Sequence, residues 1–339
     1  MISVFQLEKL DAWARAHALP EHRLKRFRIA FFKKGAPLAA CMEEIPEPIR
    51  DAFASSIDLG DLRLAFRQNS SQDGASKLTF LTHDGHPFEA VILRVASGRT
   101  SLCISSQAGC AANCAFCATG KLGLARDLTP AEILGQVIAA KRILHQEGRL
   151  LRNVVFMGMG EPFHNEKNVY AAIDLLRDVR GFYLSDRHIM VSTVGMVAAI
   201  ARFQQRYPAV RLALSLHSAR QDLRRQLMPA AKSQTLDKLR GVLPPAHAPY
   251  PMMIEVLLLE GVNDSDSDID ALIDYLRGVN AHINLIQFNP FPGTEFRPVH
   301  RTVRERTAAI LRRAGFKVTL RRSLGDDIAA ACGQLAAAS

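Results

Sequence analysis

Three cysteines lie within eight residues, in the arrangement Cys110-x3-Cys114-x2-Cys117. The spacing brings three thiolates, which are strong metal ligands, into one loop directly after a predicted strand at 100–105. A structural zinc site takes four protein ligands, and no fourth Cys or His lies near this loop in the sequence. Three ligands to a four-iron cube would instead leave one iron open to bind another molecule. We therefore expect this loop to hold a metal centre.

The remaining features of the chain suggest a reducing compartment. The first residues show no basic region followed by an apolar one, so we expect no signal peptide. No apolar run approaches the roughly 18–20 residues that a membrane helix needs. We expect a soluble, cytoplasmic protein without a membrane partner. Its six cysteines should then be reduced, and they are better interpreted as ligands or catalysts than as structural disulfides.

Strands and helices alternate from about residue 99, and this order positions the cysteine loop. We predict strands at 100–105, 153–157, 188–193, 210–216, 252–259 and 282–288. We predict helices at 130–145, 167–177, 197–205, 268–277 and 304–314. Thr129 followed by Pro130 is a typical helix start. The pattern indicates an α/β protein with a parallel sheet or barrel, whose ligands gather at the carboxyl ends of the strands.

Residues 1–85 are predicted to form a small accessory domain, and 86–339 the main domain. The first part contains a helical apolar pattern and strand candidates at 62–67 and 77–82, and a further candidate follows at 86–95. It also contains a cluster of bases without an acid: Arg23, Lys25, Arg26, Arg28, Lys33 and Lys34. A solvated helix face and an RNA contact both explain such a cluster, and the sequence leaves the choice open.

The cysteine loop, with Phe116 before its last cysteine, resembles the radical S-adenosylmethionine (SAM) signature. Over residues 89–334 the chain resembles the RlmN/Cfr family of rRNA adenine methyltransferases, whereas the likeness is weak before residue 85. The stretches that carry it are 101–110, 156–162, 191–193, 214–217, 289–293 and 325–335. The resemblance implies a partial (β/α) barrel of the radical SAM type. It also implies a 4Fe-4S cluster on Cys110, Cys114 and Cys117.

The resemblance further implies a mechanism that uses two SAM molecules per turnover. Cys332 takes a methyl group from the first SAM, by displacement at a thiolate. The second SAM yields a radical that removes hydrogen from this S-methyl group, and the resulting carbon radical adds to the adenine. Glu89 accepts a proton from the adduct. Cys103 then attacks the Cys332 sulfur and forms a transient disulfide that frees the product.

A SAM pocket is expected at the carboxyl ends of the strands. Gly160 would let the backbone approach the ligand, and Glu161 would accept from the SAM amino group. A single polar residue at a strand end more often forms hydrogen bonds within the protein than binds a ligand. By resemblance, further residues line SAM jointly: Ser192, Ser215, Leu216, His217 and Asn289. Cys41 lies outside every motif and is interpreted as an ordinary buried residue.

The charge of the chain favours an anionic partner. The net charge is +10 and the pI about 9.6. A stretch at 301–322 carries eight bases and one acid and leads to the Cys332 segment. A solvated helix face would explain it as well as an RNA contact. By resemblance, the substrate is 23S rRNA, with tRNA as a further possibility. The resemblance also implies a flavodoxin-type electron donor, and a monomer is the default expectation.

Some motifs are Cfr-like and others RlmN-like, so the sequence does not choose between adenine carbon 2 and carbon 8. Two rival interpretations stay open at this stage. One is a radical SAM enzyme acting on a peptide or metabolite, which would leave Cys103, Cys332 and the basic surface without a role. The other is a non-catalytic RNA-binding protein stapled by zinc or an inert iron–sulfur cluster.

Overall fold

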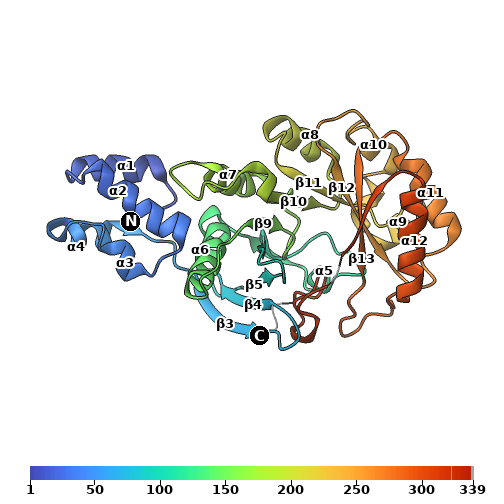
Figure 1. Ribbon diagram of the computed structural model, residues 1–339, viewed down its shortest axis with the longest axis horizontal. Helices are drawn as coiled ribbons and strands as arrows, with labels where there is room; N and C mark the ends of the chain where they lie inside the picture. Colours follow the sequence, from blue (N-terminus) through green and yellow to red (C-terminus); the bar gives the residue numbers. More distant parts are fainter. Residues whose placement is uncertain (322, 337–339) are drawn as a thin grey trace.

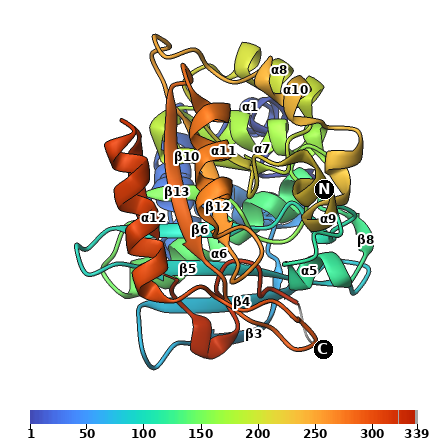
Figure 2. The same ribbon diagram turned by 90° about the vertical axis from the view of Figure 1, so that its right-hand side faces the viewer.

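The computed structural model describes residues 1–321 and 323–336, and a single large sheet organises them. Its ten strands follow the order β14-β13-β12-β11-β10-β9-β6-β5-β4-β3. The neighbours from β14 to β6 pair in parallel, whereas β5, β4 and β3 continue the sheet in antiparallel pairing. The two ends of this order do not pair with each other, so the parallel strands form a partial barrel (Figures 1 and 2).

The strand bounds agree closely with the expected ones. The parallel strands are β6 (Thr100–Ile104), β9 (Asn153–Phe156), β10 (Ile189–Thr193), β11 (Arg211–Ser215), β12 (Met252–Leu258), β13 (Ala281–Gln287) and β14 (Lys317–Arg321). The antiparallel strands are β3 (Arg63–Asn69), β4 (Ala75–Leu81) and β5 (Pro87–Arg94). The strand β14 was missed in the sequence, where it lies inside the basic stretch at 301–322.

Helices cover the outer face of the parallel strands (Figure 1). The helices of this part of the chain are α5 (Ala118–Lys121), α6 (Pro130–Gln146), α7 (Glu166–Arg177), α8 (Val197–Arg206), α9 (Gln221–Leu227), α10 (Leu236–Arg240), α11 (Asp266–Leu276) and α12 (Arg301–Arg313), of which α5 and α9 lie at the cysteine loop. Short 3-10 turns add η2 (Asp186–His188), η3 (Pro229–Lys232) and η4 (Asp326–Ile328). The predicted start of α6 is confirmed, because Thr129 forms a capping box with Glu132 and Pro130 opens the helix.

The N-terminal helices form a separate lobe in Figure 1. This part contains β1 (Ile2–Ser3), α1 (Leu7–Ala16), α2 (Glu21–Arg28), η1 (Ile29–Lys34), α3 (Leu38–Met42), α4 (Glu47–Ser56) and β2 (Ile57–Asp58). The helix η1 is a π-helix that ends at Gly35 in the left-handed region, at φ +63°. The domain division expected at residue 85 remains a prediction. The sheet runs across that position, since β4 pairs with β5.

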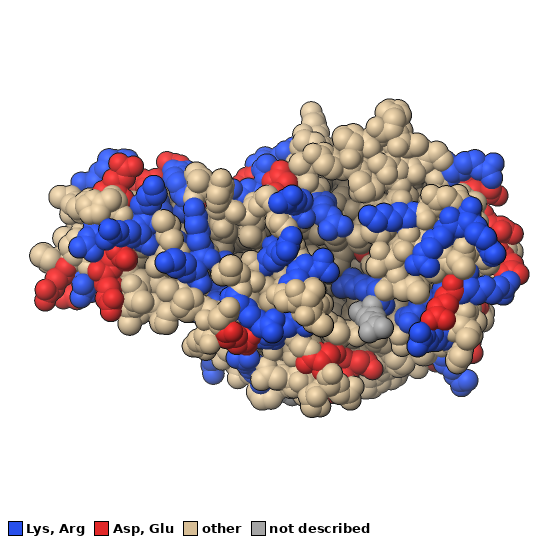
Figure 3. All heavy atoms as spheres, viewed as in Figure 1, with Lys and Arg blue, Asp and Glu red and all other residues tan. Residues whose placement is uncertain are grey.

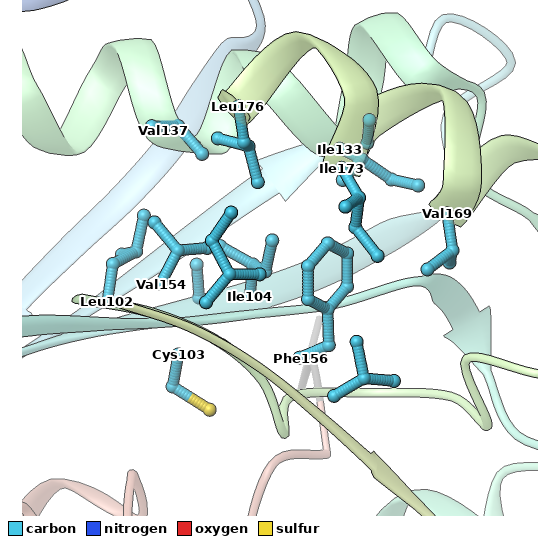
Figure 4. Packing of buried hydrophobic residues seen from close by; sticks show 14 of the residues in the cluster. Leu102, Cys103, Ile104, Ile133, Val137, Val154, Phe156, Val169, Ile173 and Leu176 are labelled. Atoms are coloured by element: carbon cyan, nitrogen blue, oxygen red, sulfur yellow. The ribbon is translucent and has the colours of Figure 1, made fainter. Parts of the chain in front are cut away.

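The apolar core lies between the strands and the helices. Figure 4 shows Leu102 and Ile104 of β6 on the side of α6 and α7, together with Val154 and Phe156 of β9. Cys103 points to the other face of the sheet in the same view. Successive side chains of a strand alternate between its faces, so the strand that builds the core also delivers a thiol to the barrel interior.

No helix among residues 1–321 and 323–336 is both long and apolar enough to cross a membrane.

Candidate active site

The cysteine loop is held by a small hairpin after β6. Its strands are β7 (Gln107–Gly109) and β8 (Leu124–Asp127), which pair antiparallel. Gly109 has φ +81°, and a Cβ there would lie 2.0 Å from the Gly123 carbonyl oxygen. Only glycine therefore permits this close approach of the two strands. The loop is also tied to α9, because the Ala115 N–H donates to the Leu227 carbonyl at 2.9 Å.

The thiols of this loop lie close enough to affect one another's ionisation. Burial raises the pKa of Cys110 to about 11, and the neighbouring Cys117 contributes to that increase. Burial raises the pKa of Cys114 further, and both neighbouring thiols add to the effect. Three thiolates in this setting need a positive centre beside them.

The donor set fits an iron–sulfur cluster. The candidate ligands are three soft sulfurs without a fourth cysteine in the loop, and Phe116 packs with them in an apolar setting. In the described part of the chain, no three His, Cys, Asp or Glu side chains converge closely enough to hold a single metal ion. A structural zinc site takes four protein ligands, one more than the three thiols of this loop.

Gly160 and Glu161 follow β9 and lie against the hairpin. Gly160 has φ +97°, and a Cβ there would lie 2.6 Å from the Gln107 Cβ. Glu161 is buried, and its oxygens accept from the N–H groups of Phe163 at 3.1 Å and Val194 at 2.8 Å. Burial raises the pKa of Glu161 to about 7 despite these bonds. This carboxyl group is thus costly to ionise until a cation lies beside it.

The next strand ends bring the remaining candidate SAM residues. Ser192 lies at the end of β10 and Ser215 at the end of β11, both half-buried, while Leu216 is fully buried. His217 has φ +58°, and its Nδ1 accepts from the Leu257 N–H at 3.1 Å, which places the ring proton on Nε2. Burial lowers the pKa of His217 to about 3.

His217 connects the strand ends with the cysteine loop. Its ring contacts Phe116 edge-on, with centroids 4.5 Å apart. The predicted SAM-binding residue His217 thus borders the predicted cluster loop. This agrees with the expectation that ligands of such barrels bind at the carboxyl ends of the strands.

The segment after β14 brings Cys332 next to the end of the cysteine loop. Several hydrogen bonds fix it. The Asn289 amide donates to the Cys332 carbonyl at 3.2 Å, and the Ala118 N–H donates to the Gly333 carbonyl at 2.8 Å. The Thr119 hydroxyl donates to the Leu335 carbonyl at 2.6 Å. Asn289, expected to line SAM, therefore also anchors the segment of Cys332.

Cys103 of β6 and Cys332 of the C-terminal segment are far apart in the sequence but lie near each other in the structure. Cys332 contributes to the raised pKa of Cys103, and both thiols contribute to the raised pKa of Arg321. Arg321 in turn acts to lower the pKa of both thiols. Burial raises the pKa of Cys103 to about 12. Surrounding protein atoms raise the pKa of Cys332, but its side chain keeps solvent-exposed surface. Both thiols are free rather than joined.

Glu89 reaches the same region from β5. It is buried, and its Oε2 accepts from the Ala336 N–H at 3.1 Å. Its Oε1 lies 3.5 Å from the Lys77 ammonium and 3.4 Å from the Thr79 hydroxyl. The antiparallel strands therefore contribute a carboxylate to the segment that carries Cys332.

Sequence reasoning missed several interior residues. Arg321 ends β14 and donates to the Met157 sulfur at 3.6 Å. Glu255 is buried in β12 and accepts from the Asn284 amide at 2.8 Å, while its Oε1 has no hydrogen-bond partner among the described residues. Two signals were present in the sequence. A carboxylate interrupts the apolar run 252–259, and residues 317–321 follow a helix as one more strand of the repeat.

The two basic stretches are partly paired with acids or other acceptors. In the first, Arg28 pairs with Asp11 at 2.8 Å and Arg23 with Glu44 at 3.6 Å. In the second, Arg306 pairs with Asp266 at 2.6 Å, and Arg301 with Glu305 at 2.6 Å. Arg301 and Arg306 are exposed, whereas Arg28 is buried, so the solvated-face interpretation does not apply to Arg28. Arg322 lies outside the described residues.

Comparison with known proteins identifies the family. The model of the radical SAM superfamily matches residues 104–276. A probable RNA methyltransferase of Rhodopirellula baltica is 44% identical over 98% of this chain and 87% of its own length. The dual-specificity RNA methyltransferase RlmN of Phenylobacterium zucineum is 40% identical, over 87% of this chain and 78% of its own. The chain belongs to the RlmN/Cfr family of radical SAM RNA methyltransferases.

The fold agrees with this membership. The crystal structure of a radical SAM methyltransferase from Sphaerobacter thermophilus superposes with a TM-score of 0.92 at 35% identity, and the match covers both chains completely. A partial barrel of the radical SAM type is thus confirmed. As a member of the RlmN/Cfr family, the protein is a SAM-dependent RNA methyltransferase with a 4Fe-4S cluster and SAM as cofactors. This outcome decides against the non-catalytic alternative and against a peptide or metabolite enzyme.

Proposed function

We propose that this protein methylates a ring carbon of an adenine in 23S rRNA, through an S-methylcysteine on Cys332 that Cys103 resolves. The observation that carries the proposal is the convergence of two non-ligand thiols and a buried carboxylate beside the cysteine loop. Cys103 comes from β6, Cys332 from the C-terminal segment and Glu89 from β5. A methyltransferase that acts by direct displacement has no need of two further thiols.

We infer that Cys110, Cys114 and Cys117 hold the cluster. When bound, the reduced cluster and SAM supply a methyl group for a thiolate and, from a second SAM, a radical that removes a hydrogen atom. Glu161 lies at a strand end where it can accept from the SAM ammonium, which would also lower its raised pKa. The pocket walls in this proposal are Gly160, Ser192, Ser215, Leu216, His217 and Asn289.

Each thiol has a task that its surroundings suit. Cys332 keeps solvent-exposed surface, so both SAM and the base can reach its sulfur. The neighbouring Arg321 favours the thiolate form, which displaces the methyl group. Glu89 takes the proton from the adenine carbon once the base is attached. Once the adduct has given up its unpaired electron, for which the cluster would be the acceptor, the Cys103 thiolate attacks the Cys332 sulfur. The sulfur–carbon bond breaks, its electron pair stays on the methylene carbon, and that carbon takes a proton to become the methyl group. The disulfide that forms is later reopened by reducing equivalents.

The RNA would bind on a face that is rich in basic side chains. Figure 3 shows Lys and Arg side chains across one face, from the N-terminal helices to the rim of a hollow in the main part. Backbone phosphates would be held by such charges, while the target adenine leaves its stack to enter the site. The proposal includes a flavodoxin-type electron donor and a monomeric enzyme. The name "dual-specificity RNA methyltransferase" of a relative agrees with a second RNA substrate, and we propose tRNA as the alternative.

The decisive experiment is mass spectrometry of 23S rRNA after anaerobic incubation with cluster-loaded enzyme, SAM and a reductant. A methylated adenosine, mapped by digestion and chromatographic retention to carbon 2 or carbon 8, is the expected result, and it also fixes the position. The same incubation with tRNA tests the alternative substrate. SAM cleavage without methylation of either RNA would contradict the proposed substrate.

A further inference from the structure

Arg224 is a fully buried arginine without an acidic partner. It lies on α9 at 0% exposure and belongs to no ion pair in the described part of the chain. All of its hydrogen bonds go to backbone carbonyls instead. Burying a charge without a counter-ion is costly, so this position calls for an explanation beyond packing.

Arg224 binds carbonyls at the carboxyl ends of β10 and β11 and one in the loop before α10. Its Nη2 donates to the Val194 carbonyl at 2.7 Å and its Nε to the Leu216 carbonyl at 3.2 Å. Its Nη1 donates to the Gln234 carbonyl at 3.0 Å. The planar guanidinium group thus spans the two strand ends where the candidate SAM residues lie. Its position is fixed from several sides.

The same helix packs on the cysteine loop. Leu223 and Leu227 flank Arg224 and share an apolar cluster with Ala112 and Cys114. The Leu227 carbonyl accepts from the N–H of Ala115, the residue after Cys114. Arg224 therefore lies on the helix that contacts the Cys114 side of the loop, between two residues that pack against it. Burial lowers the pKa of Arg224 only to about 10, so the group is protonated at neutral pH.

We propose that Arg224 is the buried counter-charge of the cluster centre and raises its reduction potential. The inference rests on the proposed assignment of the cluster to Cys110, Cys114 and Cys117. An oxidised four-iron core carries fewer positive charges than its three thiolates carry negative ones, and reduction adds one more negative charge. A fixed cation in an apolar setting stabilises the reduced form most. Arg224 thus acts as a positioning residue that favours acceptance of the electron.

The test is the midpoint potential of the cluster, measured by an anaerobic redox titration followed by electron paramagnetic resonance. Three variants of the full-length, cluster-loaded protein are compared with the wild type. Arg224→Met removes the charge, and Arg224→Lys keeps it while losing the planar hydrogen-bonding group. Arg225→Met removes the same charge from the neighbouring residue of α9, whose side chain is exposed.

We expect a more negative potential in Arg224→Met and values near the wild type in the other two variants. An unchanged potential in Arg224→Met at wild-type iron content would overturn the proposal. So would an equal shift in Arg225→Met, which would show a general charge effect. If Arg224→Met binds no cluster, Arg224→Lys decides: a wild-type potential supports the role of charge, and a clearly more negative one refutes it.

A separate variant tests the assumption beneath the inference. Cys114→Ala should lose the iron and the brown colour of the protein. If the cluster persists in Cys114→Ala, the ligand assignment fails, whatever the potentials of the Arg224 variants show.

Discussion

The two thiols of the proposed mechanism sit in regions of opposite character. Cys103 lies on β6 near the centre of the sheet, is 8% exposed, and has neighbours fixed by strand pairing on both sides. Cys332 is exposed and lies in an irregular segment held by individual hydrogen bonds. A rigid strand suits Cys103, because in the proposed mechanism it reacts with a single partner, the Cys332 sulfur. An exposed, irregular segment suits Cys332, because its sulfur reacts in turn with SAM, the adenine and Cys103.

The largest effect is expected from Cys332→Ala. The variant has no sulfur to carry the methyl group, so RNA methylation should vanish while the iron content stays normal. Incorporation of label from methyl-labelled SAM into RNA measures this loss. Cys41→Ala is the matched control, because Cys41 is a buried thiol outside the site. Methylation by Cys332→Ala would contradict the carrier role.

Cys103→Ala should separate the two thiols. Methyl transfer to Cys332 should persist, but release should fail, so that a covalent protein–RNA species accumulates after one turnover. Denaturing electrophoresis with labelled RNA detects this adduct, and nuclease digestion should leave a nucleotide mass on the Cys332 peptide. Normal turnover in this variant would show that another group resolves the adduct.

Glu89→Gln should slow the reaction without changing the segment that Glu89 contacts. The amide oxygen can still accept from the Ala336 N–H, but the group no longer takes a proton. Loss of a general base costs about 100-fold in rate or more. Single-turnover methylation kinetics give the value, with Glu132→Gln as a control that removes another buried carboxylate. A rate within a factor of about three of the wild type would argue against a proton acceptor at this position.

The contrast between strand and segment also explains what the sequence could predict. The helix at 130–146, its Thr129 cap and the strand of Cys103 follow from local patterns of period and capping. The cysteine loop follows from its spacing. Arg224 has no such signal, because its partners are backbone carbonyls from three separate segments. Contacts that depend on tertiary assembly leave no trace in a local pattern.

Alkylation offers a direct view of the difference in access. In reduced, cluster-loaded protein, iodoacetamide should modify Cys332 at least about tenfold faster than Cys103, because thiolate fraction and exposure control the rate. Cys103 is buried, and its pKa is raised to about 12. Peptide mass spectrometry over time measures both rates, and the buried Cys41 serves as an internal reference. Equal rates would mean that β6 opens as readily as the C-terminal segment.

The smallest effect should come from loosening the segment itself. Gln334 donates to the Pro290 carbonyl at 3.0 Å and to Asp326 Oδ1 at 2.7 Å, and its Oε1 accepts from the Ala331 N–H at 3.1 Å. Gln334→Ala leaves these groups without partners and lets the position of Cys332 vary. If the activation free energy rises by about 1 kcal/mol because the Cys332 sulfur is less well oriented, kcat decreases about fivefold.

The KM for SAM should stay unchanged in Gln334→Ala, since the strand ends that form the proposed pocket are intact. Gln146→Ala, at the exposed end of α6, provides the control. A decrease in kcat beyond about 100-fold would mean that the segment is held far more tightly than its hydrogen bonds suggest. An unchanged kcat would mean that the contacts of Thr119 and Asn289 alone place the Cys332 sulfur.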